Sequence, residues 1–185
     1  MKTTPLELGF KAPEFELPDV VSGNRVTLQN VRGENATLVM FICNHCPYVI
    51  HVRSELIRLA KDYQLKGVGF VAISANDAER YPDDGPEKMK ELAEEMEFPF
   101  PYLYDESQEV AKAYDAACTP DFALFDNDLK CVYRGRLDGS TPGNDQPLNG
   151  ADMRRALDDL LNEHMIDWQQ EPSMGCSIKW KENNQ

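Results

Sequence analysis

The sequence has few basic residues and no long apolar run, and each shortage excludes a class of protein. Lysine and arginine number 19 against 32 aspartates and glutamates, which gives a formal net charge of −13. Nucleic-acid binding needs clustered basic side chains, so it is not predicted. Residues 1–7 lack the apolar core of a secretory signal, and no later stretch is long enough to span a bilayer. We therefore expect a cytoplasmic protein that contacts neither nucleic acid nor membrane.

Cysteine is also scarce. The five cysteines are odd in number and irregularly spaced, which argues against the disulfide framework of a small secreted protein. In a reducing compartment, a Cys-x-x-Cys pair is more often catalytic or metal-binding than structural. The 185 residues suffice for one domain with a good core, so we expect a single domain over residues 1–185.

The chain is organised around Cys43-Asn44-His45-Cys46-Pro47. Residues 37–42 form an apolar run typical of a buried strand, and the apolar residues that follow recur on one helical face as far as about residue 66. Two sulfurs at this junction can close a small disulfide across the first helical turn. The positive helix end stabilises a thiolate on the first of them. The pattern predicts a dithiol redox site in which Cys43 is the more exposed sulfur.

Other elements follow from hydrophobic period and turn residues. An N-terminal extension, residues 1–33, contains a predicted hairpin, and residues 68–74 are a second buried strand, parallel to the first. A helix opens at Pro86, and a later strand pair and a last helix complete the body. The tail, residues 164–185, holds Trp168, Ile178 and Trp180, so we expect it to dock on the body.

These features together resemble the thioredoxin superfamily. The resemblance rests on Cys-x-x-Cys after a strand, Thr119-Pro120 before a later hairpin, and a closing helix, and it covers about residues 8–161. Residues 10–17 are similar to the redoxin branch, the alkyl hydroperoxide reductase/thiol-specific antioxidant group. Residues 172–180 look like the tail of an uncharacterised redoxin subgroup with the same Cys-Asn-His-Cys-Pro site.

The resemblance implies an α/β fold with a thioredoxin-like central mixed sheet flanked by helices, the N-terminal hairpin and the docked tail being additions. It implies that Pro120 is a cis-proline facing the cysteines and that Thr119 aligns a substrate's extended chain, with Asn44 and Pro47 as further substrate-binding positions. Expected partners are protein or small-molecule disulfides and thiols, with an upstream thiol reductant. No metal or organic cofactor is expected, and the oligomeric state stays open.

Three departures from the family pattern matter. Thioredoxins place a Trp before the first cysteine, where this chain has Ile42, and they bury an acid on the preceding strand, where residues 36–42 contain none. Peroxiredoxins use Pro-x-x-x-Thr-x-x-Cys, but counting back from Cys43 gives Met40 and Ala36. A thiol-dependent peroxidase with Cys43 as peroxidatic cysteine is therefore the alternative, and a thiol–disulfide oxidoreductase is the main prediction.

In that reaction Cys43 attacks a partner's disulfide, and Cys46 resolves the mixed disulfide. His45 lies between the sulfurs, where an imidazolium would favour the thiolate and make the site more oxidising. The other interpretation of His45 is a solvated loop residue of little effect. The pair Asp83-Asp84 is interpreted as a solvated face.

The remaining thiols leave alternatives open. Cys118, two residues before Pro120, is either close to the site or a small buried apolar residue. Cys176 in the docked tail would be a relay or second resolving cysteine. A second alternative function is a non-enzymatic binding or zinc-holding module. Tetrahedral zinc needs two more ligands, which His45 and Cys176 would supply only if the fold brought them together.

Overall fold

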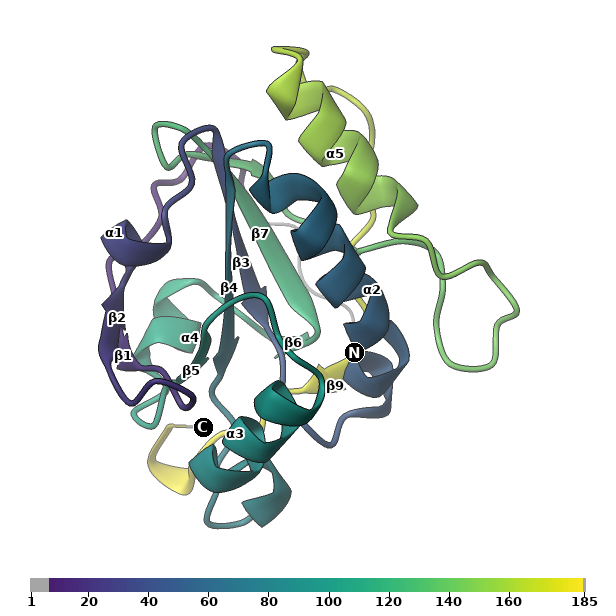
Figure 1. The fold of residues 1–185 in the computed structure, drawn as a ribbon. Helices are drawn as coiled ribbons and strands as arrows, with labels where there is room; N and C mark the ends of the chain where they lie inside the picture. Colours follow the sequence, from purple (N-terminus) through teal and green to yellow (C-terminus); the bar gives the residue numbers. More distant parts are fainter. Residues whose placement is uncertain (1–6, 185) are drawn as a thin grey trace.

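A five-stranded mixed sheet forms the centre of the computed structural model, which describes residues 7–184 (Figure 1). Its strand order is β5-β4-β3-β7-β8. The pairs β3–β4 and β4–β5 are parallel, whereas β3–β7 and β7–β8 are antiparallel. The bounds of these strands are Ala36–Phe41 (β3), Val68–Ser74 (β4), Tyr102–Tyr104 (β5), Asp121–Asp126 (β7) and Cys131–Tyr133 (β8). The predicted α/β fold with a central mixed sheet is confirmed.

The helices and smaller elements surround this sheet (Figure 1). The predicted N-terminal hairpin is present as two short paired strands. Residues 1–6 of the extension that contains it lie outside the described part. Within residues 7–184, no helix is long and apolar enough to cross a membrane. The remaining elements are β1 (Glu16–Pro18), β2 (Arg25–Thr27), α1 (Leu28–Val31), α2 (Pro47–Gln64), η1 (Pro82–Asp84), α3 (Pro86–Glu95), α4 (Glu109–Ala113), β6 (Cys118–Thr119), α5 (Ala151–Leu161), β9 (Cys176–Ser177) and η2 (Glu182–Asn184).

Both faces of the sheet are covered, which explains why every residue of β3 is buried and all but Thr37 are apolar. Alternate side chains of a strand point to opposite faces. Leu38 and Met40 join a buried cluster with residues of α2, α3 and α5, while Val39 and Phe41 join a second cluster under the hairpin, α1 and α4. Figure 1 shows α2 and α5 on one side of the sheet and the hairpin with α1 and α4 on the other.

The C-terminal tail docks on the body, as expected. Its strand β9 pairs antiparallel with β6, so that Thr119 lies opposite Cys176. Ile178 is buried, and its backbone N–H donates to the carbonyl of Ala117 over 3.2 Å. The peptide bond between Thr119 and Pro120 is cis. The tail therefore runs beside the cis-proline segment.

A buried ion pair stabilises the cis-proline segment. The guanidinium of Arg134 lies 3.0 Å from the carboxylate of Asp121, and the two side chains are only 3% and 1% exposed. The same guanidinium donates to the carbonyls of Tyr114 (2.7 Å) and Asp115 (3.1 Å). One buried cation thus ties the end of α4 to the first residue of β7, next to Pro120.

Removing this cation should be costly. Arg134→Met leaves the Asp121 carboxylate buried without its partner, and we expect the free energy of unfolding to fall by about 3–5 kcal/mol. Urea denaturation at neutral pH measures the loss. The control is Arg25→Met, which removes an exposed pair with Glu16 and should cost less than about 1 kcal/mol. Equal losses in the two variants would contradict the assigned role.

Candidate active site

The two cysteines of the motif lie where the central strand turns into the longest helix. β3 ends at Phe41, and Ile42 extends the ladder by donating its N–H to the carbonyl of Ile73 over 3.0 Å. Cys46 is the N-cap residue of α2, and Pro47 is its first helical residue. Proline suits that position because the first N–H groups of a helix have no intrahelical partner. The Cys-x-x-Cys turn is thus fixed between a buried strand and a helix N-terminus.

The fold brings a third sulfur to this pair. The Sγ atoms of Cys46 and Cys176 are 2.7 Å apart, and Cys46 Sγ is 3.2 Å from the carbonyl oxygen of Thr119. Cys43 Sγ lies 3.4 Å from the Thr119 hydroxyl. Thr119, next to Pro120, therefore contacts both sulfurs of the motif. Cys118 is buried one residue earlier, and its thiol lies 3.6 Å from the carbonyl of Pro120.

The two sulfurs of the motif hardly differ in exposure, although Cys43 was predicted to be the more exposed one. Cys43 is 1% exposed and Cys46 is 0% exposed, so the first sulfur is not open to solvent. Cys176 is partly exposed. The prediction followed from the position of Cys43 at the helix start. In the structure Cys43 Sγ lies against the Thr119 hydroxyl, and Cys46 Sγ lies against Thr119 and against Cys176 of the tail.

The thiolate is also not where the sequence placed it. The pKa of Cys46 falls from 9.0 to about 4, mainly because the Cys43 thiol donates to it, with further donation from Cys176 and from the backbone N–H of Val49. That same donation, burial and the nearby Asp84 charge raise the pKa of Cys43. Burial and the contact with Cys46 raise the pKa of Cys176 to about 11. These directions favour a thiolate on Cys46 over one on Cys43.

A buried carboxylate that the sequence analysis missed holds the turn between the cysteines. Asp84 is 0% exposed, and its Oδ1 accepts the backbone N–H groups of Asn44 (2.8 Å) and His45 (3.1 Å). Its Oδ2 accepts from the side chain of Asn76 over 2.8 Å and contacts His45 Nδ1. The interpretation of Asp83-Asp84 as a solvated face is therefore wrong for Asp84, although Asp83 is exposed.

His45 and Asn44 are both engaged by their surroundings. The imidazole of His45 contacts Asp84 and stacks on Tyr81, with ring centroids 5.7 Å apart and an interplanar angle of 2°. The Asn44 side chain accepts from the Tyr102 hydroxyl over 3.0 Å and donates to the carbonyl of Asp83 over 2.9 Å. These contacts fix the dipeptide between the sulfurs, and they make His45 more than a solvated loop residue.

The same residues include a set that could ligate a metal ion. Ligand atoms of Cys43, His45 and Asp84 lie within 4.8 Å of one another. Thiolate, imidazole and carboxylate are all zinc ligands, and Cys46 and Cys176 lie close by. The tertiary structure thus supplies the ligands that the sequence spacing alone did not.

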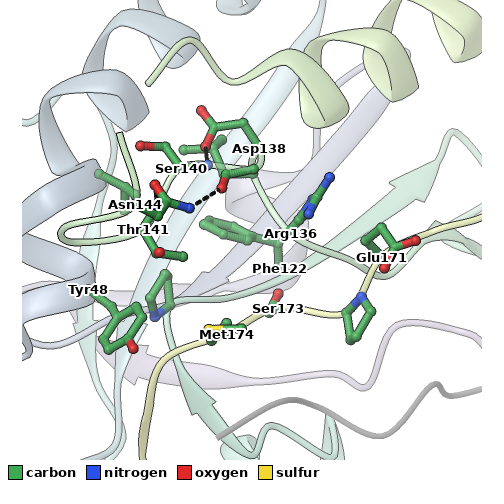
Figure 2. Close-up of a pocket in the computed structure, with 15 residues that line it drawn as sticks. Tyr48, Phe122, Arg136, Asp138, Ser140, Thr141, Asn144, Glu171, Ser173 and Met174 are labelled. Atoms are coloured by element: carbon green, nitrogen blue, oxygen red, sulfur yellow. Dashed lines mark hydrogen bonds between the residues drawn. The ribbon is translucent and has the colours of Figure 1, made fainter. Parts of the chain in front are cut away.

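A pocket of about 210 Å³ opens beside the cis-proline. It is lined by Pro120 and Phe122, by Tyr48 at the start of α2, by the loop of residues 138–144 and by tail residues 171–174. Figure 2 shows Asp138, Ser140 and Asn144 on one side and Ser173 and Met174 on the other. The loop is shaped by the buried Asp138 carboxylate, which accepts the backbone N–H groups of Ser140, Asn149 and Gly150 over 2.6–2.9 Å.

Comparisons with known proteins agree with this geometry. The chain is 31% identical over 115 residues to two proteins of Mycobacterium tuberculosis that bear the provisional name peroxiredoxin, which is 62% of this chain and 68% of theirs. It is similar to the crystal structure of an uncharacterised conserved protein from Geobacillus kaustophilus (60% identity, TM-score 0.96, 98% of this chain and 96% of that one).

A more distant structure shows the fold alone. The thioredoxin domain of a thiol-disulfide oxidoreductase from Bacteroides vulgatus superimposes with a TM-score of 0.61 at 22% identity, over 82% of this chain and 99% of that one. The model of the AhpC/TSA family matches residues 8–134, which include the hairpin, the Cys-x-x-Cys turn, Asp84 and the cis-proline. Strand order, cis-proline and family match all agree, and the chain belongs to the AhpC/TSA family, a redoxin with a thioredoxin-like fold.

Proposed function

We propose that the protein is a thiol–disulfide oxidoreductase whose redox pair is Cys43 and Cys46. The family and fold support thiol-based redox chemistry. The observation that carries the finer proposal is that Thr119, next to the cis-proline, contacts both sulfurs at the N-terminus of α2: its hydroxyl lies 3.4 Å from Cys43 Sγ and its carbonyl oxygen 3.2 Å from Cys46 Sγ. A thiolate is the form that exchanges disulfides.

In the direct form of the reaction, Cys43 passes its proton to the Cys46 thiolate and attacks one sulfur of the partner's disulfide, which breaks. The other sulfur leaves as a thiolate and takes the proton from Cys46, and the partner stays bonded to Cys43 as a mixed disulfide. The Cys46 thiolate then attacks Cys43, a Cys43–Cys46 disulfide forms, and the partner leaves as a thiolate. An upstream thiol reductant returns the pair to the dithiol. Partners are protein or small-molecule disulfides and thiols, and a cytoplasmic location would supply the reductant. The pocket beside Pro120 offers space for the part of a partner next to its sulfur.

A thiol-dependent peroxidase is the second candidate. The provisional names of the Mycobacterium tuberculosis relatives support it, and so does one contact of this site. The Thr119 hydroxyl lies 3.4 Å from Cys43 Sγ, so a hydroxyl stands beside that sulfur although the sequence motif that normally supplies one is missing. Peroxide would oxidise Cys43 to a sulfenic acid, which the Cys46 thiolate would resolve with loss of water.

A redox titration tests the main proposal. In glutathione buffers, we expect Cys43 and Cys46 to become protected from alkylation together and reversibly, as read by peptide mass. Cys43→Ser and Cys46→Ser should each abolish disulfide exchange with a model disulfide. Cys131→Ala is the control, because that thiol is buried in β8, in the cluster under the hairpin.

Two other results would change the assignment. Saturable peroxide consumption that is lost in Cys43→Ser, without exchange activity, would favour the peroxidase. Cysteines that stay unreactive until a chelator is added would indicate a metal site instead of a redox pair.

The lowered pKa of Cys46 predicts a pH dependence of stability. The unfolded thiol titrates near 9.0 and the folded one near 4, so between these values the unfolded state binds more protons. The free energy of unfolding of the reduced protein should therefore rise with pH from about 4 to 9, by at most about 1.4 kcal/mol per pH unit. Above pH 9 the raised pKa of Cys43 reverses the slope. Denaturation curves of wild type and Cys46→Ser measure this, and a pH-independent difference between them would contradict it.

Removing the charge of Asp84 should shift the redox potential of the Cys43–Cys46 pair. The negative charge of Asp84 lies beside a dithiol whose reduced form carries a thiolate and whose disulfide is neutral, so Asp84→Asn should stabilise the reduced form and raise the midpoint potential, by about 30 mV for a tenfold change in the equilibrium constant. An asparagine oxygen can still accept the two backbone N–H groups that Asp84 Oδ1 accepts. Asp83→Asn is the matched control, since that side chain is exposed and only its backbone carbonyl contacts Asn44. A lower potential for Asp84→Asn would refute the assigned sign.

A further inference from the structure

Cys176 is the one sulfur of the cluster that the proposed pair leaves unused. The antiparallel pairing of β9 with β6 sets Thr119 opposite Cys176, and this register places the two sulfurs 2.7 Å apart. A disulfide needs its two sulfurs about 2.05 Å apart, with the backbones close together. A shift of less than an ångström therefore separates the present contact from a Cys46–Cys176 bond.

The tail can hold this position only with glycine before the cysteine. A Cβ atom on Gly175 would lie 1.9 Å from the carbonyl oxygen of Thr119, so no other residue fits against the cis-proline segment. Hydrogen bonds fix the tail on both sides of this contact. The Ser173 hydroxyl donates to the carbonyl of Gly135 over 2.9 Å, and the Lys179 N–H donates to the side chain of Asn76 over 2.9 Å. The position of Cys176 is thus specified from both sides.

The three sulfurs differ in their exposure to solvent. Cys43 and Cys46 are buried, and Cys176 is partly exposed. While the tail is docked, the backbone of Thr119 is paired with the chain itself and is not open to an extended peptide. A reactant must then reach a sulfur without pairing with that backbone, which favours a small molecule over a protein chain.

We propose that Cys176 is the thiol through which a low-molecular-weight thiol reduces the buried pair, by way of a Cys46–Cys176 disulfide. This inference rests on the proposed function, because it takes Cys43–Cys46 as the oxidised state. In the first step Cys176 attacks Cys46, the Cys43–Cys46 bond breaks, and the proton of Cys176 ends on Cys43.

The external thiol completes the cycle in two further steps. Its thiolate attacks the partly exposed Cys176, the Cys46–Cys176 bond breaks, and Cys46 leaves as a thiolate. A leaving thiolate of low pKa departs faster, and the pKa of Cys46 is about 4. A second external thiolate then attacks the external sulfur of the mixed disulfide and frees Cys176. Two thiols are oxidised to one external disulfide, and the protein disulfide is reduced to two thiols.

Two measurements on the full-length protein test this relay. First, oxidised glutathione should convert Cys43→Ser to a form in which peptide mass shows Cys46 joined to Cys176, since the bond can no longer move to Cys43. Second, reduced glutathione should reduce the oxidised Cys176→Ser variant about tenfold more slowly than wild type. The Cys43–Cys46 midpoint of the variant is measured alongside, because Cys176 contacts Cys46 and the rates must be compared at equal driving force. Cys131→Ala should reduce at the wild-type rate.

The outcomes distinguish failure of the relay from failure of the proposed oxidoreductase function. A Cys43–Cys46 pair that cycles in wild type, with no Cys46–Cys176 product and no rate loss in Cys176→Ser, would overturn the relay and leave the oxidoreductase standing. No reversible disulfide in wild type would overturn both. Zinc bound in fresh wild-type protein and lost from Cys176→Ser would show that the third thiol is a metal ligand, and this too would overturn the relay.

Discussion

The buried carboxylate of Asp84 is the constraint on which the site depends. Its two oxygens bind the backbone of Asn44 and His45, the His45 ring and the side chain of Asn76. The other end of the Asn76 side chain accepts the N–H of Lys179 in the tail. A charge buried in this way is tolerated only when donors surround it, and here the donors come from the cysteine turn and the end of β4. One carboxylate thus fixes the conformation of the turn between the cysteines and, through Asn76, the position of the tail beside it.

This arrangement also decides which sulfur carries charge. The contact with Cys46 and burial raise the pKa of Cys43 most, and the negative charge of Asp84 beside it raises the pKa further. Cys46, at the N-cap of α2, receives a backbone N–H and two thiol donors. Thioredoxins place an acid on the strand before the motif, where β3 has none. In this chain the acid comes from η1, in the segment after β4, and it binds the backbone of the turn between the cysteines.

The fold could be predicted from the sequence, and the site only in part. The two central strands are apolar on both faces because helices cover both, and Cys-x-x-Cys with Thr119-Pro120 fixed their place in a known architecture. Docking of the tail followed from its large apolar residues. Asp84 was not predicted because the sequence Pro-Asp-Asp-Gly does not distinguish a solvent-exposed turn from a turn packed over a site. Its one signal was a charged insertion next to a motif that lacks its usual acid.

The exposure of the sulfurs could not be predicted because it depends on a contact distant in sequence. Position along a helix says which sulfur comes first, but the sulfur that lies against Cys46 belongs to a segment about 130 residues later. The tail replaces with its own β9 the strand that the family resemblance implies for a substrate at Thr119. A reactant at this site therefore meets side chains instead of an open backbone edge: the Cys176 sulfur, and next to it the pocket lined by Met174, Pro120 and Tyr48. Recognition then rests on sulfur chemistry and on the shape of that pocket, and the tail is as much a part of the site as the motif it covers.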